Sequence, residues 1–125
     1  MDSDKRVIVY VCGRITGEDF HSAKQKFVNA EILLKEDFFS NAKHVVVLNP
    51  IHLPGGLDQE HYMDICLAMV RSCDIIYALE GFHMSKGALV ETALASKLGK
   101  KIIGDRPSTK EYIQELFGGD NEDTF

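Results

Sequence analysis

The chain has 125 residues, a length that argues for one domain core of ~100–150 residues rather than two. Its 14 Lys and Arg against 19 Asp and Glu give a formal net charge of −5 at pH 7, which argues against a surface that neutralises a phosphodiester backbone and hence against a nucleic-acid partner. The 45% of hydrophobic residues exclude a disordered chain, and no apolar run approaches the ~18 residues that a membrane span needs.

The first two predicted elements are a strand and a long helix. Residues 6–12, RVIVYVC, form a nearly continuous apolar run that ends at Gly13, a pattern typical of a strand buried on both faces of a parallel sheet. Residues 18–39 carry apolar side chains at three- and four-residue steps, the period of an amphipathic helix. The positions predicted to be buried on this helix are Phe20, Ala23, Phe27, Ala30, Leu34 and Phe38.

Two more strands and a helix follow in the middle of the chain. Residues 44–48, HVVVL, predict a buried strand that ends at Asn49-Pro50, because proline lacks a backbone donor. The segment 51–58 contains two adjacent glycines after a proline and predicts a loop. Residues 59–72 predict a helix and residues 74–79, DIIYAL, a third strand. The predicted buried stripe of the helix is Tyr62, Ile65, Cys66, Met69 and Val70.

The last part of the chain completes an alternating pattern. A helix over about 86–98, a strand over 101–104 and a helix over about 107–117 are predicted in turn. Four alternations of strand and helix predict an α/β fold, a three-layer sandwich around a doubly wound parallel sheet of four or five strands, flavodoxin-like or Rossmann-like. We expect residues 1–117 to form a single domain and residues 118–125 an acidic C-terminal tail.

The loops after the strands are the expected ligand-binding edge. In open parallel sheets, ligands bind beyond the carboxyl ends of the strands, near the point where the strand order reverses. Here that edge carries the segments 13–17, 49–56, 80–87 and 104–105, which hold most of the loop glycines. A binding site is therefore predicted among these segments.

The loop Gly13-Arg14-Ile15-Thr16-Gly17 joins the first strand to the first helix. Backbone N–H groups of such a loop, together with the helix N-terminus, can hold a phosphate or a ribose. The loop lacks the Gly-Lys-Ser/Thr ending of a P-loop and the three spaced glycines of a dinucleotide fingerprint. A tight turn without a ligand is the alternative, and a solvated surface charge is the alternative to Arg14 as an anion-binding residue.

Glu91 is the candidate catalytic residue. On a wheel of 100° per residue, small and apolar side chains lie within about 60° of it, while polar ones project elsewhere. Burial of a carboxylate costs several kcal/mol unless hydrogen bonds or a raised pKa compensate, so such a residue is a candidate for function. The structural alternative is a glutamate that pairs with a buried donor. The neighbours are Gly87, Ala88, Leu94, Ala95 and Leu98, and the polar residues are Lys86, Thr92, Ser96 and Lys97.

Other polar residues are given structural or secondary roles. Ser85 is a predicted N-cap whose hydroxyl, with the Gly87 amide, also suits a phosphate. Asp74 begins the third strand, at the edge opposite the binding loops, and is expected to be structural. Asp64 lies about 200° around its helix from Cys66 and is expected to face solvent.

Histidine and cysteine spacing gives no metal site and no disulfide framework. The five histidines lack metal-ligand spacing, although His52 and His83 lie in ligand-side loops. The three cysteines, Cys12, Cys66 and Cys73, lack Cys-x-x-Cys spacing and are expected to be buried small hydrophobes. No cofactor is expected. The first residues, MDSD, lack the basic and apolar regions of a secretory signal, so a cytoplasmic location is expected.

Three blocks of the sequence resemble the nucleoside 2-deoxyribosyltransferase superfamily, and especially a small uncharacterised branch found in bacteria and their phages. Tyr10-x-Cys12-Gly13-x-Ile15-Thr16-Gly17 is similar to its first-strand substrate loop, and Asp74-Ile75-Ile76-Tyr77-x-Leu79-x-Gly81-Phe82 to its third-strand block. Ser85-x-Gly87-Ala88-x-x-Glu91 resembles its nucleophile motif, and Asn49-Pro50 matches more weakly. The resemblance covers roughly residues 6–104.

This resemblance implies a function in N-glycosidic chemistry. Glu91 would attack the anomeric carbon of a 2′-deoxynucleoside or its 5′-monophosphate and displace the base, and Ser85 would bind the 5′ end. The implied partner is a small-molecule nucleoside or nucleotide, and relatives that complete their sites with neighbouring subunits imply a homo-oligomer. The predicted substrate-binding residues are Gly13, Arg14, Ile15, Thr16, Gly17, Asn49, Pro50, Gly81, Ser85 and Gly87.

One position departs from the pattern of the superfamily. Catalytic members usually carry an aspartate on the second helix that assists proton transfer to the leaving base, and the matching position here is Cys66. Asp58, His83 or a neighbouring subunit would then have to supply the proton. A non-catalytic nucleotide-binding or sensing module is therefore the alternative function, and a phage-encoded interaction protein with a vestigial pocket is a third. The Phe82-His83-Met84 loop and Phe125 are candidate contact surface for an oligomer.

Overall fold

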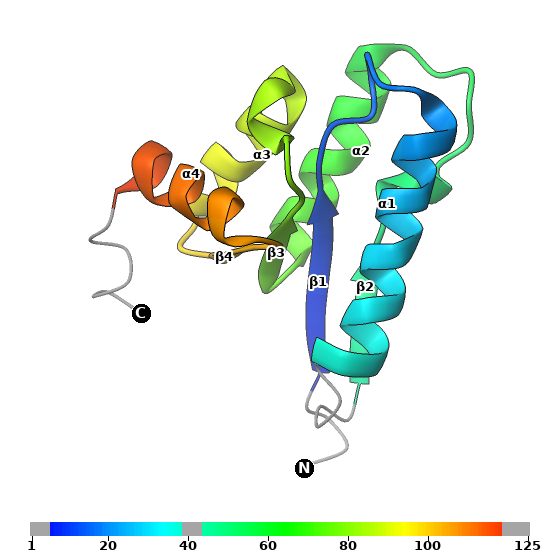
Figure 1. The fold of residues 1–125 in the computed structure, drawn as a ribbon. Helices are drawn as coiled ribbons and strands as arrows, with labels where there is room; N and C mark the ends of the chain where they lie inside the picture. Colours follow the sequence, from blue (N-terminus) through cyan, green and yellow to red (C-terminus); the bar gives the residue numbers. More distant parts are fainter. Residues whose placement is uncertain (1–5, 39–43, 119–125) are drawn as a thin grey trace.

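The computed structural model describes residues 6–38 and 44–118, in which strands and helices alternate along the chain (Figure 1). Short helical turns, η2 (Leu34–Phe38), η3 (Pro50–His52) and η4 (Phe82–Met84), lie between the main elements. The strands are β1 (Arg6–Cys12), β2 (His44–Leu48), β3 (Ile75–Ala78) and β4 (Lys101–Gly104), and the α-helices are α1 (Phe20–Leu33), α2 (Gln59–Ser72), α3 (Lys86–Lys97) and α4 (Pro107–Phe117).

The four strands of the described residues form one parallel sheet in the order β2-β1-β3-β4. The chain therefore moves from β1 to one side and then returns to the other side, so that the strand order reverses between β1 and β3. This arrangement confirms the predicted doubly wound α/β fold. Cys12, the last residue of β1, pairs with Ala78, the last residue of β3, so the two carboxyl ends lie at the same level.

Alternate residues of the central strand β1 pack into two separate cores, one on each face of the sheet. Val9 and Val11 of β1 pack with Phe27 of α1 on one face of the sheet. Tyr10 and Cys12 pack on the other face with residues of α2 and α3. Burial of both faces of β1 explains why its residues after Arg6 are all apolar rather than alternating with polar residues. Together with the sheet, the helices on its two faces make the predicted three layers (Figure 1).

The first helix begins two residues later than the periodicity predicts. Asp19 is its N-cap, and the side-chain Oδ2 accepts a hydrogen bond from the Ser22 N–H at 3.0 Å. As a result Phe20 lies in the first turn and is 60% exposed, so the prediction that this ring is buried is wrong. Ala23, Phe27 and Ala30 are buried as predicted, and η2 continues the helix as a π-helical turn to residue 38, where the described segment ends.

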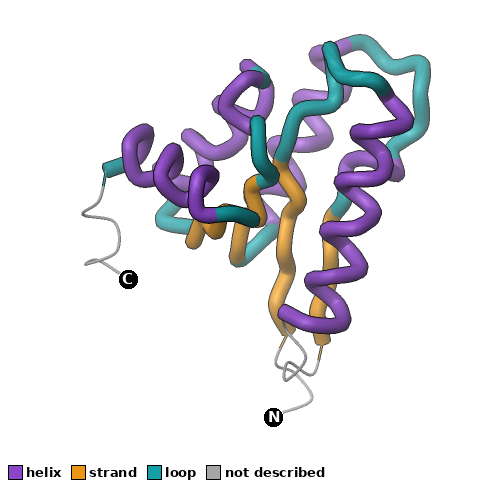
Figure 2. The backbone as a smooth tube through the Cα atoms, in the orientation of Figure 1, coloured by secondary structure: helices purple, strands orange, loops and turns teal. Residues whose placement is uncertain are grey.

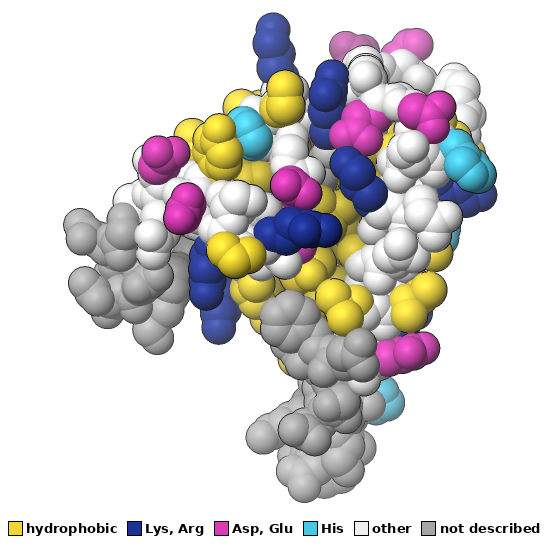
Figure 3. Space-filling model, viewed as in Figure 1, with side chains coloured by type: hydrophobic (Ala, Val, Ile, Leu, Met, Phe, Trp, Pro, Cys, Tyr) yellow, Lys and Arg dark blue, Asp and Glu magenta, His cyan; other side chains and the backbone are white. Residues whose placement is uncertain are grey.

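The structure corrects one part of the predicted contact surface, the loop Phe82-His83-Met84. Phe82 is fully buried in the core beside α3, so it is not contact surface, whereas Met84 in the same turn is exposed. In Figure 3, hydrophobic side chains gather over α3 and α4.

The predicted acidic tail beyond Gly118, including Phe125, lies outside the described residues. Among the residues described, none of the helices has the length and apolar character that a membrane crossing requires.

Candidate functional site

A pocket of about 270 Å³ opens at the carboxyl ends of the strands, where the strand order reverses. The loops that follow β1 and β2 lie at this same end of the sheet (Figure 2). The volume is close to the lower limit of ~300–1,000 Å³ for ligand pockets and suits a single small molecule rather than a dinucleotide. Its walls are formed by Tyr10, Gly13, Ile15, Thr16, Phe20, Pro50, Ile51, Leu53, Gly55, Gln59, Tyr62, Met63, Cys66, Ser85, Gly87, Ala88 and Glu91.

Glu91 projects from α3 into this pocket and is only 7% exposed. The buried residues of α3 are Ala88, Glu91, Thr92 and Ala95, so the carboxylate lies at one side of the buried stripe, next to the cavity. Thr92 is fully buried, contrary to its predicted outward orientation, and its hydroxyl offsets the cost of burial by donating a hydrogen bond to the Ala88 carbonyl at 3.0 Å. The neighbour Leu98, at the end of the helix, is exposed.

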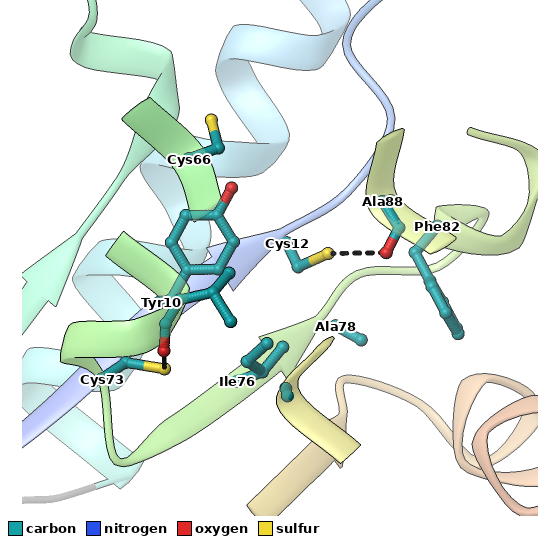
Figure 4. Close-up of a cluster of buried hydrophobic side chains, with 10 residues drawn as sticks. Tyr10, Cys12, Cys66, Cys73, Ile76, Ala78, Phe82 and Ala88 are labelled. Carbon is teal, nitrogen blue, oxygen red and sulfur yellow. Dashed lines mark hydrogen bonds between the residues drawn. The ribbon is translucent and has the colours of Figure 1, made fainter. Parts of the chain in front are cut away.

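Two side chains of β1 hold the Glu91 carboxylate. The Tyr10 hydroxyl donates to Oε1 at 2.9 Å, and the Cys12 thiol lies 3.4 Å from the same oxygen. Oε2 accepts no hydrogen bond from the described part of the chain, so the carboxylate is fixed through one oxygen and the other has no protein partner there. Figure 4 shows Tyr10 and Cys12 projecting from β1 in the core beside α2 and α3, with Cys66 beyond the end of the tyrosine ring.

Burial dominates the electrostatics of this group of side chains. Desolvation raises the pKa of Glu91 to about 7, although the hydrogen bonds from Tyr10 and Cys12 oppose the shift. Burial, reinforced by the nearby Glu91, also raises the pKa of Tyr10 and that of Cys12 well above their usual values. The carboxyl is therefore the group in this cluster that changes its charge near neutral pH, while the phenol and the thiol remain protonated donors.

Tyr10 and Cys12 contact Glu91, although their sequence positions indicated only a core strand and a block of the superfamily resemblance. The tyrosine in a predicted buried strand was the available signal for this contact, because a buried tyrosine hydroxyl needs a hydrogen-bond partner. Residues two apart on a strand share a face, so Tyr10 and Cys12 had to point the same way. The sequence does not say which helix faces them, and for that reason the contact with Glu91 was not predicted.

The loop after β1 contributes part of its predicted residues to the pocket. Gly13, Ile15 and Thr16 line it, whereas Arg14 folds back on its own loop and donates to the carbonyls of Thr16 at 3.3 Å and Gly17 at 3.4 Å. A Cβ on Gly13 would lie 3.1 Å from the Phe27 ring and 3.2 Å from the Leu79 side chain, so a larger residue here would force a neighbour to shift. Thr16 is held in place because its hydroxyl accepts a hydrogen bond from the Gln59 amide of α2 at 3.3 Å.

The start of α3 forms the opposite wall. Ser85 is the N-cap, and its hydroxyl oxygen accepts a hydrogen bond from the Ala88 N–H at 3.1 Å, as predicted. The hydroxyl hydrogen of Ser85 is not used by that bond and is available to a ligand. Gly87 also lines the pocket, which brings its backbone into the site at the positive end of the helix.

Asn49 and Gly81, predicted to bind substrate, do not line the pocket. The Asn49 amide is buried and donates to the Phe27 carbonyl at 3.0 Å and to Glu31 at 2.9 Å, so it ties β2 to α1. Gly81 has a φ of 86° and begins the turn η4, a backbone role that favours glycine. Pro50, in contrast, lies in the pocket wall as predicted.

The candidate proton donors named from the sequence also lie elsewhere. Asp58 is strongly exposed before α2, and His83 stacks on Tyr112 of α4 with ring centroids 3.7 Å apart. Asp64 is exposed, as predicted. Asp74 accepts a hydrogen bond from the Ile8 N–H at 2.9 Å, which joins β3 to β1 away from the carboxyl ends of the strands and gives it a structural role.

Cys66 lies at the position where the superfamily resemblance implies an acid. It lines the pocket from α2, and burial raises the pKa of its thiol to about 11. A thiol with this pKa is a weak acid near neutral pH. The pocket therefore combines one well-placed carboxylate with hydroxyl and thiol groups, and no second carboxyl side chain of the described residues lies in its wall.

Fold and site together define the class of this protein: a Rossmann-like α/β domain with a sheltered glutamate in a pocket at the switch point of its sheet. Residues 7–104 match the model of a family described as a domain of unknown function (DUF4406), and the chain belongs to that family. No curated protein matches the sequence significantly.

The fold is similar to a solved structure described as Clostridium botulinum CMP N-glycosidase, BcmB. The two chains are 18% identical, the match covers 89% of this chain and 83% of the other, and the TM-score is 0.54. At this level of identity the similarity concerns the fold. The resemblance to the nucleoside 2-deoxyribosyltransferase superfamily and to its bacterial and phage branch stays a prediction from the sequence.

Proposed function

We propose that this protein cleaves the N-glycosidic bond of a nucleoside, in particular a 2′-deoxynucleoside or its 5′-monophosphate, through Glu91 as nucleophile. The observation that carries the proposal is the state of this side chain. It is buried in a pocket wall and held through Oε1 by Tyr10 and Cys12, and Oε2 has no hydrogen-bond partner among residues 6–38 and 44–118. Carboxylates of this kind trap the anomeric carbon of a sugar as it develops oxocarbenium character.

The chemistry follows from the geometry of the two oxygens. Oε2 attacks C1′ as the bond from C1′ to the base breaks, and a glycosyl ester of Glu91 forms. Tyr10 and Cys12 keep the carboxylate in one orientation, which lowers the entropic cost of reaching the reacting carbon. Water or a second base then attacks C1′ from the face that the base left, so the product retains the configuration of the substrate.

The sugar end of the substrate would lie between the two turns at the mouth of the pocket. Ser85 keeps a donor hydrogen after capping α3, and the first N–H groups of that helix suit a 5′-hydroxyl or a 5′-phosphate. Thr16, positioned by Gln59, offers a hydroxyl from the opposite side. The similar structure described as a CMP N-glycosidase supports a nucleotide-processing role for this fold, and transfer or hydrolysis would depend on the acceptor.

A non-catalytic nucleotide-binding or sensing module is the second candidate function. It is favoured by Cys66, which occupies the pocket wall where a proton donor for the leaving base would be useful and whose raised pKa makes it a poor acid. The loss of general-acid assistance costs a rate factor of ~10²–10⁴. Tight nucleotide binding without turnover would favour this candidate.

The test measures, by chromatography, the release of free base from a panel of deoxynucleosides and deoxynucleoside 5′-monophosphates. Wild type is compared with Glu91→Gln and Glu91→Ala, and with Glu111→Gln, which removes an exposed carboxylate on α4 as a matched control. We expect release by wild type and by the control, and none above background by the two Glu91 variants. Undiminished release by Glu91→Ala would remove this residue from the mechanism.

A further inference from the structure

The charged group in the described wall of the pocket is acidic, and no basic side chain lies beside it there. Among residues 6–38 and 44–118, its wall contains one carboxyl side chain, that of Glu91, and no lysine, arginine or histidine. Two cations are sequence neighbours of wall residues. Arg14 is turned onto its own loop by hydrogen bonds to two backbone carbonyls, and Lys86 is exposed in the first turn of α3 and does not line the pocket. A positively charged ligand therefore meets an attractive and uncompensated partner, because charges interact strongly in a partly desolvated site.

As far as the described residues form it, the same wall has no side chain suited to protonate a leaving base. The Tyr10 hydroxyl already donates to Glu91, and burial raises the pKa of this phenol well above its usual value. Cys66 has a pKa of about 11 because it is buried. The Tyr62 hydroxyl donates to the Pro54 carbonyl at 2.7 Å, which fixes the loop before α2. The remaining hydroxyls, on Thr16 and Ser85, are aliphatic alcohols and do not act as acids near neutral pH.

We propose that the preferred substrate is a nucleoside whose heterocycle is positively charged, a proposal that rests on the N-glycosidic cleavage proposed above. The juxtaposition that carries it is a lone buried carboxylate and the absence of an acid from the described pocket wall. Two kinds of compound share this chemistry: pyridinium nucleosides, in which the glycosidic nitrogen is quaternary, and purine nucleosides alkylated at N7. In both, the base departs as a neutral molecule and needs no proton.

The step balances without any further reactant. Oε2 of Glu91 forms a bond to C1′, and the electron pair of the C1′–N bond goes to the heterocycle. The negative carboxylate becomes a neutral ester, and the cationic ring becomes a neutral base. Water then attacks C1′, the ester bond breaks to return the carboxylate, and the proton of the attacking water goes to solvent. A neutral base would instead leave as an anion beside Glu91, which explains why an acid would be required for it.

Aromatic side chains in the wall suit the same ligand. Phe20 lines the pocket although it is largely exposed at the start of α1, and Tyr62 lines it from α2. The face of an aromatic ring attracts a cation within about 6 Å and also stacks on a flat heterocycle. Phe20 does not belong to the buried stripe of its helix, and stacking on the cationic heterocycle of the ligand would be the role of this exposed side chain.

The experiment uses two matched pairs that differ in charge and little in shape. The first is nicotinamide riboside and its neutral 1,4-dihydro form, and the second is N7-methylguanosine and guanosine, each as ribonucleoside and 2′-deoxyribonucleoside. Release of the base by the full chain is measured as kcat/KM, and the background rate measured with Glu91→Gln is subtracted. We expect the charged member of at least one pair to be cleaved at least about 10²-fold faster than its neutral partner.

Each outcome decides a different claim. A preference for the charged member in only one of the two pairs identifies whether the pocket binds pyridinium nucleosides or purine nucleosides alkylated at N7. Neutral nucleosides cleaved as fast as the charged ones, or faster, overturn this inference and leave the proposed N-glycosidic activity standing. No release from any of the probes, and none from the panel of neutral deoxynucleosides, overturns the proposed activity together with the inference.

Discussion

Replacement of Glu91 by glutamine should stabilise the protein in a pH-dependent way. Burial raises the pKa of this carboxyl to about 7 from the ordinary value of 4.5. Between these two pH values the folded state holds a proton that the unfolded state has released. The free energy of unfolding of the wild type therefore falls as the pH rises through this window and levels off above it. Glu91→Gln keeps the shape of the side chain and removes the titration.

The size of the effect follows from the shift itself. A displacement from 4.5 to about 7 corresponds to about 3 kcal/mol of destabilisation of the wild type above neutral pH. The difference in unfolding free energy, Glu91→Gln minus wild type, should thus grow by about 3 kcal/mol between about pH 4 and about pH 8. Tyr10 and Cys12, whose pKa values Glu91 helps to raise, titrate above this pH range, so the groups that titrate within it act on both proteins alike and cancel in the difference.

Urea unfolding at a series of pH values measures this difference directly. Glu31→Gln is a control of opposite sign: burial raises the pKa of Glu31, but hydrogen bonds with Asn49, His52 and Lys35 outweigh it and hold the pKa below its usual value. For that variant the difference from wild type should fall as the pH rises through the acidic range. A Glu91→Gln difference that stays flat, or falls, over the same range would refute the reasoning that this carboxylate is buried at a cost.

The other predictions concern the pocket and its support. Tyr10→Phe removes a hydrogen bond to the carboxylate and should lower kcat/KM by about 10-fold to 100-fold and raise the midpoint of its pH dependence, which a pH–rate profile checks. The wild-type profile itself should rise through about pH 7 as Glu91 ionises, and a rate that is constant from about pH 5 to about pH 9 would contradict the assignment. Cys66→Asp places an acid in the pocket and should speed base release from neutral nucleosides by ~10²–10⁴, while a folded variant with no gain would contradict the view that a proton donor is missing. Gly13→Ala should cost about 1–3 kcal/mol of unfolding free energy because its Cβ meets side chains at 3.1–3.2 Å, and an unchanged urea midpoint would show that the loop can relax.

The fold could be predicted because the residue pattern of each strand indicates which of its faces are buried. The nearly continuous apolar run of residues 6–12 indicated a strand covered on both faces, and the alternation of strands with helices indicated parallel pairing. Helix periodicity also identified Glu91 as a carboxylate among small and apolar neighbours, and its burial in the structure is confirmed. Local periodicity is enough for these features because they depend on neighbours in the chain.

The partners of Glu91 could not be predicted, because they depend on how distant elements meet. Tyr10 and Cys12 lie about 80 residues before it, and only the packing of α3 against β1 brings them together. Phe20 satisfied the helical period, yet the N-cap at Asp19 places it at the helix end beside the pocket. Asn49 matched a substrate-binding position by resemblance, whereas its amide is occupied by contacts within the fold.

The central claim is that Glu91 forms a covalent bond to the sugar during turnover. Mass spectrometry of peptides from protein quenched during reaction with a slowly turned-over 2-fluoro nucleoside tests it directly. The account predicts one added sugar on the peptide that contains Glu91, and no adduct on the Glu91→Gln variant. Release of free base by a protein that carries no adduct on this peptide, or an adduct on another side chain, would contradict the account.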